Sequence, residues 1–140
     1  MNILGIETSC DETSVSIVRD GNAICNVIRT QPIHSKYGGV VPELASRQHE
    51  HHIIRLIEEA ILLSKINKDD IDLISVTYGP GLMGALLVGL NVAKGLSIGL
   101  NIPLFCINHL EGHIYANMID NKDLKYPFLC LLVSGGHTQI

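Results

Sequence analysis

The 140-residue sequence contains no tryptophan, and aromatic residues make up only 4% of it. Few side chains are therefore available to stack on unpaired bases. The formal charge is −4 and the ten basic residues are scattered along the chain, so no basic stripe indicates a nucleic-acid surface. We expect no sequence-specific contact with nucleic acid from this chain, and an RNA partner would need other subunits in order to bind.

The chain also lacks a C-x-x-C pair, because its four cysteines lie far apart and mostly within apolar runs. They are predicted to be small buried thiols, which suits a reducing cytoplasm. The N-terminus has no basic segment followed by a long apolar run, so it does not indicate secretion. Only residues 82–100 approach the length of a membrane span, and Asn91, Lys94 and four glycines interrupt them. We predict a buried helix there and no membrane partner.

The hydrophobic content is 46%, which is enough to build the core of one globular domain. Short β-branched runs predict three antiparallel strands at 3–7, 13–18 and 23–29, with a turn at Asp20-Gly21 before the third. Isoleucines at helical spacing predict a helix from about Pro42 to Ser64. The other predicted elements are a loop at 34–42, a strand at 71–78, a helix within 82–100, a strand at 104–108, a helix after it and a strand starting at Phe128.

This order of elements, βββαβαβαβ, predicts an α/β fold with a mostly parallel sheet and an antiparallel meander at one edge. Small residues at Ala85, Gly89 and Ala93 are spaced by four, which predicts a helix that packs closely on the sheet. The sequence ends without a helix to cover the last strand, so we expect a longer protein.

The segment NHLEGHIYA (108–116) gathers the most potential metal ligands. On a helix, His109 and His113 are four residues apart and project from one face, the spacing with which two imidazoles reach one metal ion. Glu111 would lie on nearly the opposite side, which argues against the arrangement of zinc proteases. Two interpretations stay open, namely a metal pair and a pair that caps and packs the helix.

A catalytic metal usually has three protein ligands, so a third must come from elsewhere. His137 is one candidate, and a carboxylate from a part of the protein outside this sequence is favoured over it. Nitrogen and oxygen ligands without thiolate indicate one divalent metal, iron(II) or zinc.

Three further segments carry reactive side chains. VSGGHT (133–138) places two glycines at a strand end, where backbone amides can form an anion nest, although a simple tight turn is favoured. ETSCDETS (7–14) could coordinate a cation or take a proton, although a solvated hairpin tip is favoured. RQHEHH (47–52) is predicted to be a solvated helix face that includes His49 and His52.

Five segments together resemble the tRNA adenosine threonylcarbamoyltransferase family, which was earlier described as glycoproteases. They are GIETSCDETS, HSKYGGVVPELASRQH, YGPGLMGALLVG, NHLEGHIYA and LLVSGGHTQ. The resemblance spans the chain in colinear order. It implies the actin-like ATPase fold of the sugar-kinase and heat-shock chaperone superfamily, with residues 1–125 as the first lobe and 126–140 as the start of a truncated second lobe.

The resemblance also implies an activity, the transfer of a threonylcarbamoyl group from threonylcarbamoyl-AMP to the exocyclic amine of the adenosine next to the anticodon of tRNA. By that analogy His109 and His113 bind the metal, and Asp11 and Glu12 are functional acids beside the donor. The residues implied to line the donor site are Leu132, Val133, Ser134, Gly135 and Gly136.

Family members act with a paralogous actin-like subunit and a small ATPase, in the cytoplasm. The family's third metal ligand, an aspartate, lies beyond the length of this sequence, so the resemblance implies that the 140-residue chain is inactive alone. Two alternatives remain. One is a metalloprotease, which the H-x-E-x-H pattern invites, and the other is a non-catalytic actin-like partner module, against which the histidine pair argues.

Overall fold

A computed structural model describes residues 1–121, 123–133 and 138–140 of the chain. The predicted helix at 42–64 and strand at 104–108 have the predicted bounds, whereas the predicted loop at 34–42 begins inside a short 3-10 helix. The elements are β1 (Asn2–Glu7), β2 (Glu12–Arg19), β3 (Asn22–Thr30), η1 (Pro32–Tyr37), α1 (Pro42–Ser64), η2 (Lys68–Asp70), β4 (Leu73–Gly79), α2 (Met83–Leu100), β5 (Leu104–Asn108), α3 (His109–Asp120), β6 (Leu132–Val133) and β7 (Thr138–Gln139).

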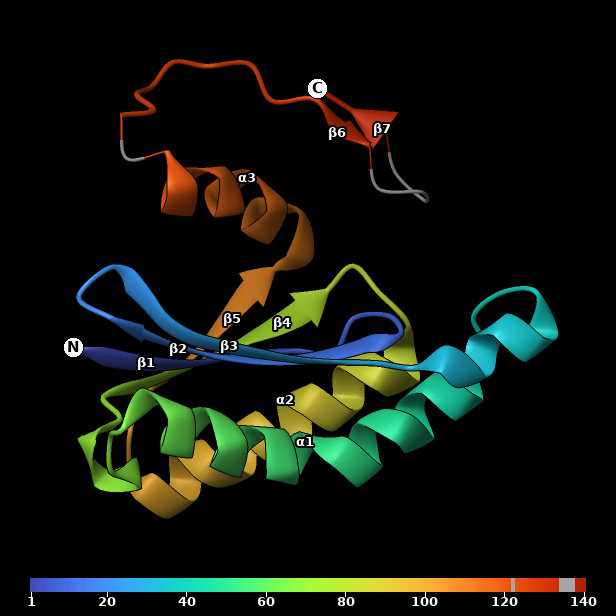
Figure 1. Cartoon of the computed structure of the whole chain (residues 1–140), viewed down its shortest axis with the longest axis horizontal. Helices are drawn as coiled ribbons and strands as arrows, with labels where there is room; N and C mark the ends of the chain where they lie inside the picture. The colour runs from blue at the N-terminus through green and yellow to red at the C-terminus, as the bar shows by residue number, and fades with distance from the viewer. Residues whose placement is uncertain (122, 134–137) are drawn as a thin grey trace.

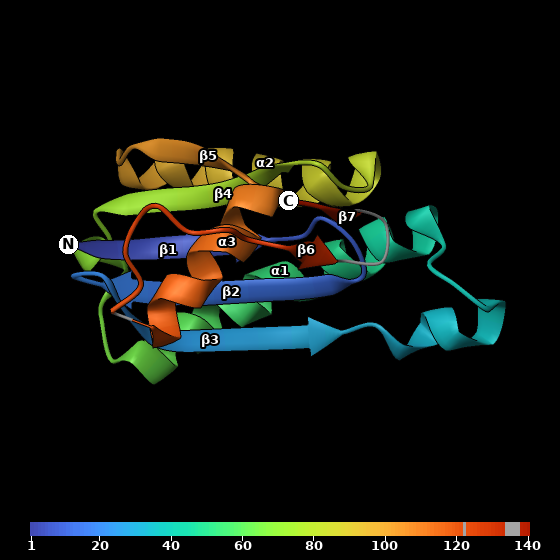
Figure 2. The ribbon, with the colours of Figure 1, turned by 90° about the horizontal axis from the view of Figure 1, so that it is seen from above.

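The main sheet has five strands in the order β3-β2-β1-β4-β5 (Figure 2). The meander β1-β2-β3 is antiparallel, with Glu7 paired to Ser14 at the end of the first hairpin. Strands β1, β4 and β5 run parallel, because a helix crosses over between each pair. This confirms the predicted α/β class and the antiparallel edge of a mixed sheet.

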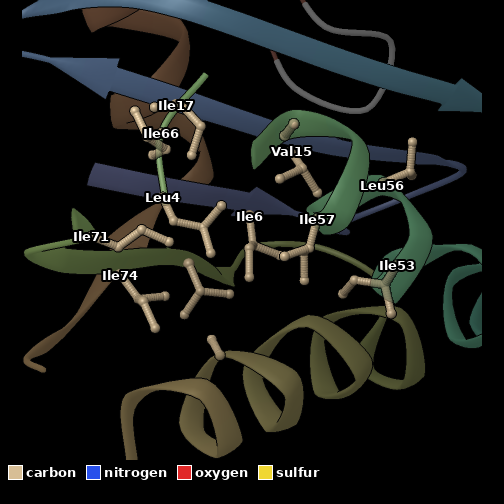
Figure 3. Packing of buried hydrophobic residues seen from close by; sticks show 13 residues of the cluster. Leu4, Ile6, Val15, Ile17, Ile53, Leu56, Ile57, Ile66, Ile71 and Ile74 are labelled. Carbon is tan, nitrogen blue, oxygen red and sulfur yellow. The ribbon is translucent and has the colours of Figure 1, made fainter. Parts of the chain in front are cut away.

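Helices α1 and α2 cover one face of the sheet, and α3 stands on the other (Figure 1). Alternate residues of each strand point toward α1 and α2, as the period of a half-buried strand requires. Leu4 and Ile6 of β1 are 1% and 4% exposed, and they pack with the same face of the neighbouring strands (Figure 3). The buried residues of the cluster are Leu4, Ile6, Val15, Ile17, Ile53, Leu56, Ile57, Ala60, Ile66, Ile71, Ile74, Val76 and Ala93.

Helix α2 approaches the sheet through its small residues, as predicted. Ala85, Gly89 and Ala93 are buried, and the Thr8 hydroxyl donates a hydrogen bond of 2.9 Å to the carbonyl of Ala85. A Cβ at Gly89 would collide with the side chain of Thr8. The absence of a side chain at Gly89 therefore lets the end of β1 lie against the helix.

The prediction that residues 82–100 form a buried helix holds for one face only. Ile98 is 81% exposed, and 22% of the segment Met83–Leu100 is buried. Within the described residues this one helix is long and apolar enough to cross a membrane by length and composition. Core helices of soluble proteins also have that length and composition, so the segment is weak evidence for a membrane span.

His49 is fully buried, so the prediction of a solvated helix face is wrong for this residue. Its Nε2–H donates to the carbonyl of Cys10 at 2.9 Å, and its Nδ1 accepts the Thr13 hydroxyl proton at 2.7 Å. Both ring nitrogens thus have partners, which is the condition for burying a polar side chain. His49 ties α1 to the turn between β1 and β2.

The prediction of buried cysteines is also wrong. Cys10 and Cys106 are exposed, and Cys25 and Cys130 are half-buried. Cys25 and Cys106 lie on β3 and β5, the two edge strands, where helices cover the sheet incompletely. Composition alone carries no information on which strand is at an edge.

The strand predicted from Phe128 begins later than expected. Among the described residues 128–133, Leu132–Val133 form a strand, which pairs antiparallel with Thr138–Gln139 in a separate two-stranded sheet. Leu129 and Leu131, which precede it, are 90% and 64% exposed. The division of the chain into 1–125 and 126–140 stays a prediction.

Candidate metal centre

The parallel strands β1, β4 and β5 bring their carboxyl ends to one edge of the sheet, where ligands bind in folds of this class. Glu7 is the last residue of β1, and Asn108 is the last residue of β5. The Asn108 side chain accepts a hydrogen bond of 2.9 Å from the amide of Leu110 and so caps α3. Helix α3 therefore starts directly at the strand end, with His109 as its first residue.

His109 and His113 project from the same face of α3, as the four-residue spacing predicts. Their Nε2 atoms lie 3.0 Å apart, and the rings meet edge to face with centroids 4.6 Å apart. Two nitrogens bound about 2.0–2.1 Å from one ion lie about 2.9–3.4 Å apart when the angle between them is about 90–110°. The pair fits a shared divalent ion, and without one the same contact is an N–H···N hydrogen bond.

Glu7 contacts the far side of the His109 ring, a role that the sequence did not predict. Its Oε2 lies 3.1 Å from His109 Nδ1, while its Oε1 accepts the backbone N–H of Ser9. Burial raises the pKa of the Glu7 carboxyl, but hydrogen bonds from Ser9, Thr77 and His109 outweigh burial and lower the pKa below its usual value. Glu7 is therefore a carboxylate at neutral pH.

The two acids singled out in the sequence share a cavity with the first histidine. It measures about 130 Å³, and it lies at the turn between β1 and β2. Asp11 is half-buried and Glu12 is exposed, whereas Thr8, Ser9 and Thr13 in the same turn are buried, so the turn is not simply a solvated hairpin tip. The lining residues are Glu7, Ser9, Cys10, Asp11, Glu12 and His109.

A larger cavity of about 620 Å³ separates α3 from the open face of the sheet. Small residues lie at the centre of its floor on the sheet, where Gly5, Ser16 and Ser75 are neighbours in the strand register. His109, Gly112, His113 and Ala116 form its wall on α3. The histidine pair thus faces a space large enough for a small-molecule ligand.

Within the described ranges, no group of three His, Cys, Asp or Glu side chains converges on one point. The described residues therefore provide two metal ligands, His109 and His113, and a third ligand would have to come from outside the described residues. His137, the third-ligand candidate in the sequence, lies outside the described residues.

Two of the five predicted donor-site residues, Leu132 and Val133, fall within the described part of the chain. Leu132 and Val133 belong to β6 and line neither cavity, and Val133 is 68% exposed. Ser134, Gly135 and Gly136 lie outside the described residues. Their role stays a prediction.

Glu111 is exposed on α3 and lines neither cavity. A general base must reach the proton that it removes. Glu111 is therefore not placed to serve as the base that the H-x-E-x-H reading of a metalloprotease requires.

A family model described as tRNA N6-adenosine threonylcarbamoyltransferase matches residues 22–140 of the chain. The chain is 57% identical to the protein of that name from Kosmotoga olearia, with 100% of this chain and 43% of that protein covered. It is 58% identical to the one from Clostridium perfringens, with coverage of 99% and 41%. The chain thus spans about two fifths of the length of the curated relatives it matches.

Among solved structures, the chain is similar to YeaZ from Pseudomonas aeruginosa. The TM-score is 0.68 at 16% sequence identity, and the match covers 86% of this chain and 49% of that one. At this level of identity the likeness concerns the fold alone.

Proposed function

Because this chain belongs to the tRNA N6-adenosine threonylcarbamoyltransferase family, we propose that it forms the first, actin-like lobe of an enzyme that modifies tRNA. The enzyme moves a threonylcarbamoyl group from threonylcarbamoyl-AMP to the exocyclic amine of the adenosine next to the anticodon. The observation that carries this proposal is the convergence of His109 Nε2 and His113 Nε2, which lie 3.0 Å apart. The first of these histidines also lines a small cavity together with Asp11 and Glu12.

The reaction is an acyl transfer. The adenosine amine attacks the carbonyl carbon of the mixed anhydride, the bond from that carbon to the phosphate oxygen breaks, AMP leaves, and the amine loses one proton. A divalent metal held by His109 and His113, iron(II) or zinc, would act as a Lewis acid that polarises the donor carbonyl or holds its oxygens.

The chain's own residues hold and orient the reactants. Glu7 and Ser9 fix the ring of His109. Asp11 and Glu12 supply acceptors for the hydroxyl and amine protons of the substrates at the mouth of the small cavity. Leu132, Val133, Ser134, Gly135 and Gly136 line the donor site, a role supported by the family resemblance.

The proposal includes three further assignments, which concern the activity of the isolated chain, its partners and its location in the cell. The 140-residue chain lacks a third ligand among its described residues, so we expect it to be inactive alone. Its net charge of −4 supports tRNA binding that is shared with other subunits, a paralogous actin-like protein and a small ATPase. The site of action is the cytoplasm.

The test is a transfer assay with radiolabelled threonine in the donor and unmodified tRNA as acceptor, with the partner subunits present. We expect no transfer by the 140-residue chain and transfer by the longer protein that contains it. His109→Ala in the longer protein should abolish transfer. Full activity of that variant would contradict the proposed site, and activity of the 140-residue chain would contradict the expected need for a second lobe.

A further inference from the structure

We propose that Glu7 is a positioning residue of this metal centre, which holds the His109 imidazole as the Nδ1–H tautomer and thereby turns the lone pair of Nε2 toward the metal. This inference rests on the proposed function, because it concerns the same histidine pair. It adds a residue from β1 that acts on the metal through His109 and is not itself a metal ligand.

The geometry around Glu7 indicates which atom carries the proton. Glu7 Oε1 accepts the Ser9 amide, and Oε2 of the same carboxyl group lies 3.1 Å from His109 Nδ1. With the carboxyl group accepting through both oxygens, His109 Nδ1 is the donor. In a neutral imidazole the other nitrogen, Nε2, then carries the lone pair. The Ser9 hydroxyl lies 3.2 Å from the same Nδ1 and supplies a second oxygen on that side of the ring.

Both side chains are partly shielded from water, which strengthens the contact. The side chains of His109 and Glu7 are 29% and 33% exposed. A charge-assisted hydrogen bond at such a site holds a ring more firmly than one on an open surface.

Glu7 is itself fixed by the backbone of the next turn. The Ser9 amide donates to Glu7 Oε1, and the Ser9 carbonyl accepts the amide of Leu82 at 2.8 Å. A Cβ at Gly81 would collide with that Ser9 carbonyl, so the turn and the start of α2 are in close contact. The carboxylate is therefore held against Nδ1, on the side of the ring that faces away from His113.

In this position Glu7 can orient the His109 ring without binding the metal. Within the described residues, Glu7 does not join the two histidines in a group that could hold an ion. Carboxylates that accept the second N–H of a metal-bound imidazole recur in metalloproteins, where they fix the tautomer and the ring orientation. The geometry around His109 has the same three parts, which are a carboxylate, a ring and an outward Nε2.

The first measurement is the tautomer of His109 in the unmodified chain. Long-range ¹H–¹⁵N correlation spectra at about pH 8, where an ordinary imidazole is neutral, distinguish Nδ1–H from Nε2–H. We expect the Nδ1–H form for His109. A predominant Nε2–H form would overturn the inference, whatever the variants do.

The second measurement is zinc affinity, determined by competition with a chromophoric chelator. Glu7→Ala should weaken zinc binding by about 10–100-fold, the usual effect of losing such a carboxylate. Glu7→Gln keeps an acceptor oxygen and should lose less affinity and retain the Nδ1–H signal. The control Glu111→Gln removes a carboxylate from α3 that lies between the two histidines in sequence but lines neither cavity. It should leave zinc affinity unchanged.

Two controls separate this inference from the proposed function. If His109→Ala binds zinc as tightly as the unmodified chain, the metal pair itself fails. If His109→Ala loses zinc while Glu7→Ala keeps both affinity and tautomer, only the role of Glu7 is refuted. Circular dichroism of each variant excludes unfolding as the cause of a lost affinity.

Discussion

The replacement His49→Ala should destabilise the protein strongly, because both ring nitrogens make buried hydrogen bonds. In the native chain Nε2–H donates to the Cys10 carbonyl at 2.9 Å, and Nδ1 accepts from the Thr13 hydroxyl at 2.7 Å. The side chains of His49 and Thr13 are both fully buried. The alanine would leave the carbonyl and the hydroxyl without these partners.

Each buried polar group that loses its partner costs about 1–3 kcal/mol, so the two together cost roughly 2–6 kcal/mol. Water that enters the space left by the ring would recover part of this, and we expect a net loss of about 3 kcal/mol in the free energy of unfolding. Urea denaturation followed by circular dichroism measures it. The matched control is His51→Ala, an exposed histidine on the same helix, which should change stability by about 0.5 kcal/mol or less. A loss for His49→Ala no larger than that of the control would refute the reasoning.

The same site predicts a pH dependence. Burial lowers the pKa of His49 below its usual value, and the nearby Glu7 and Asp11 carboxylates only partly oppose this effect. A lowered pKa in the folded state means that the unfolded chain binds the proton more readily. The stability that neutral His49 contributes is therefore present above about pH 6.5, the pKa of an unperturbed histidine, and is lost as the pH falls below it. The stability difference between the native chain and His49→Gln should shrink on acidification, and a constant difference would contradict this.

Two further predictions concern the glycines and the cysteines. Gly89→Ala should lower stability by about 1–3 kcal/mol, because its Cβ would displace Thr8. The control Gly95→Ala lies in open space on the same helix and should raise stability by up to about 1 kcal/mol. Equal effects of the two substitutions in thermal denaturation would contradict the close contact between Gly89 and Thr8. Iodoacetamide followed by peptide mass spectrometry should label exposed Cys10 and Cys106 before Cys25 in the native chain. Because desolvation and the neighbouring Asp11 raise the pKa of the Cys10 thiol, Cys10 should react more slowly than free cysteine, and a faster reaction would refute this.

Hydrophobic patterning was sufficient to predict the sheet. Strand and helix periods predict β1–β3, α1, β4, α2 and β5 in the correct order, because each has one face packed against the core, which for β3 and β5 is only partly buried. Patterning did not predict where β6 begins, since the apolar residues from Phe128 to Leu131 precede the strand and Leu129 and Leu131 are exposed. Local pattern also carries no information on which strand is at an edge, which is why the burial of Cys25 and Cys106 was predicted wrongly.

The sequence predicted one part of the candidate site, the histidine pair, and missed another, the contact of Glu7 with His109. The spacing of His109 and His113 predicted their shared face, because helix geometry is local. The contact from Glu7 to His109 joins residues that are 102 positions apart, and no local pattern reveals it. The signal that could have found it is topological, since both residues stand at the carboxyl ends of predicted strands. His49 was misassigned for the same reason, because its partners lie on β2 and on the preceding turn.

The most direct test of the metal centre is anomalous diffraction from crystals of the chain grown with zinc, recorded on both sides of the zinc absorption edge. We expect one peak about 2.0–2.1 Å from Nε2 of both His109 and His113, with Nδ1 of His109 still hydrogen-bonded to Glu7. A peak bound to Glu7 or Glu111 instead, or rings that diverge in the presence of zinc, would contradict it.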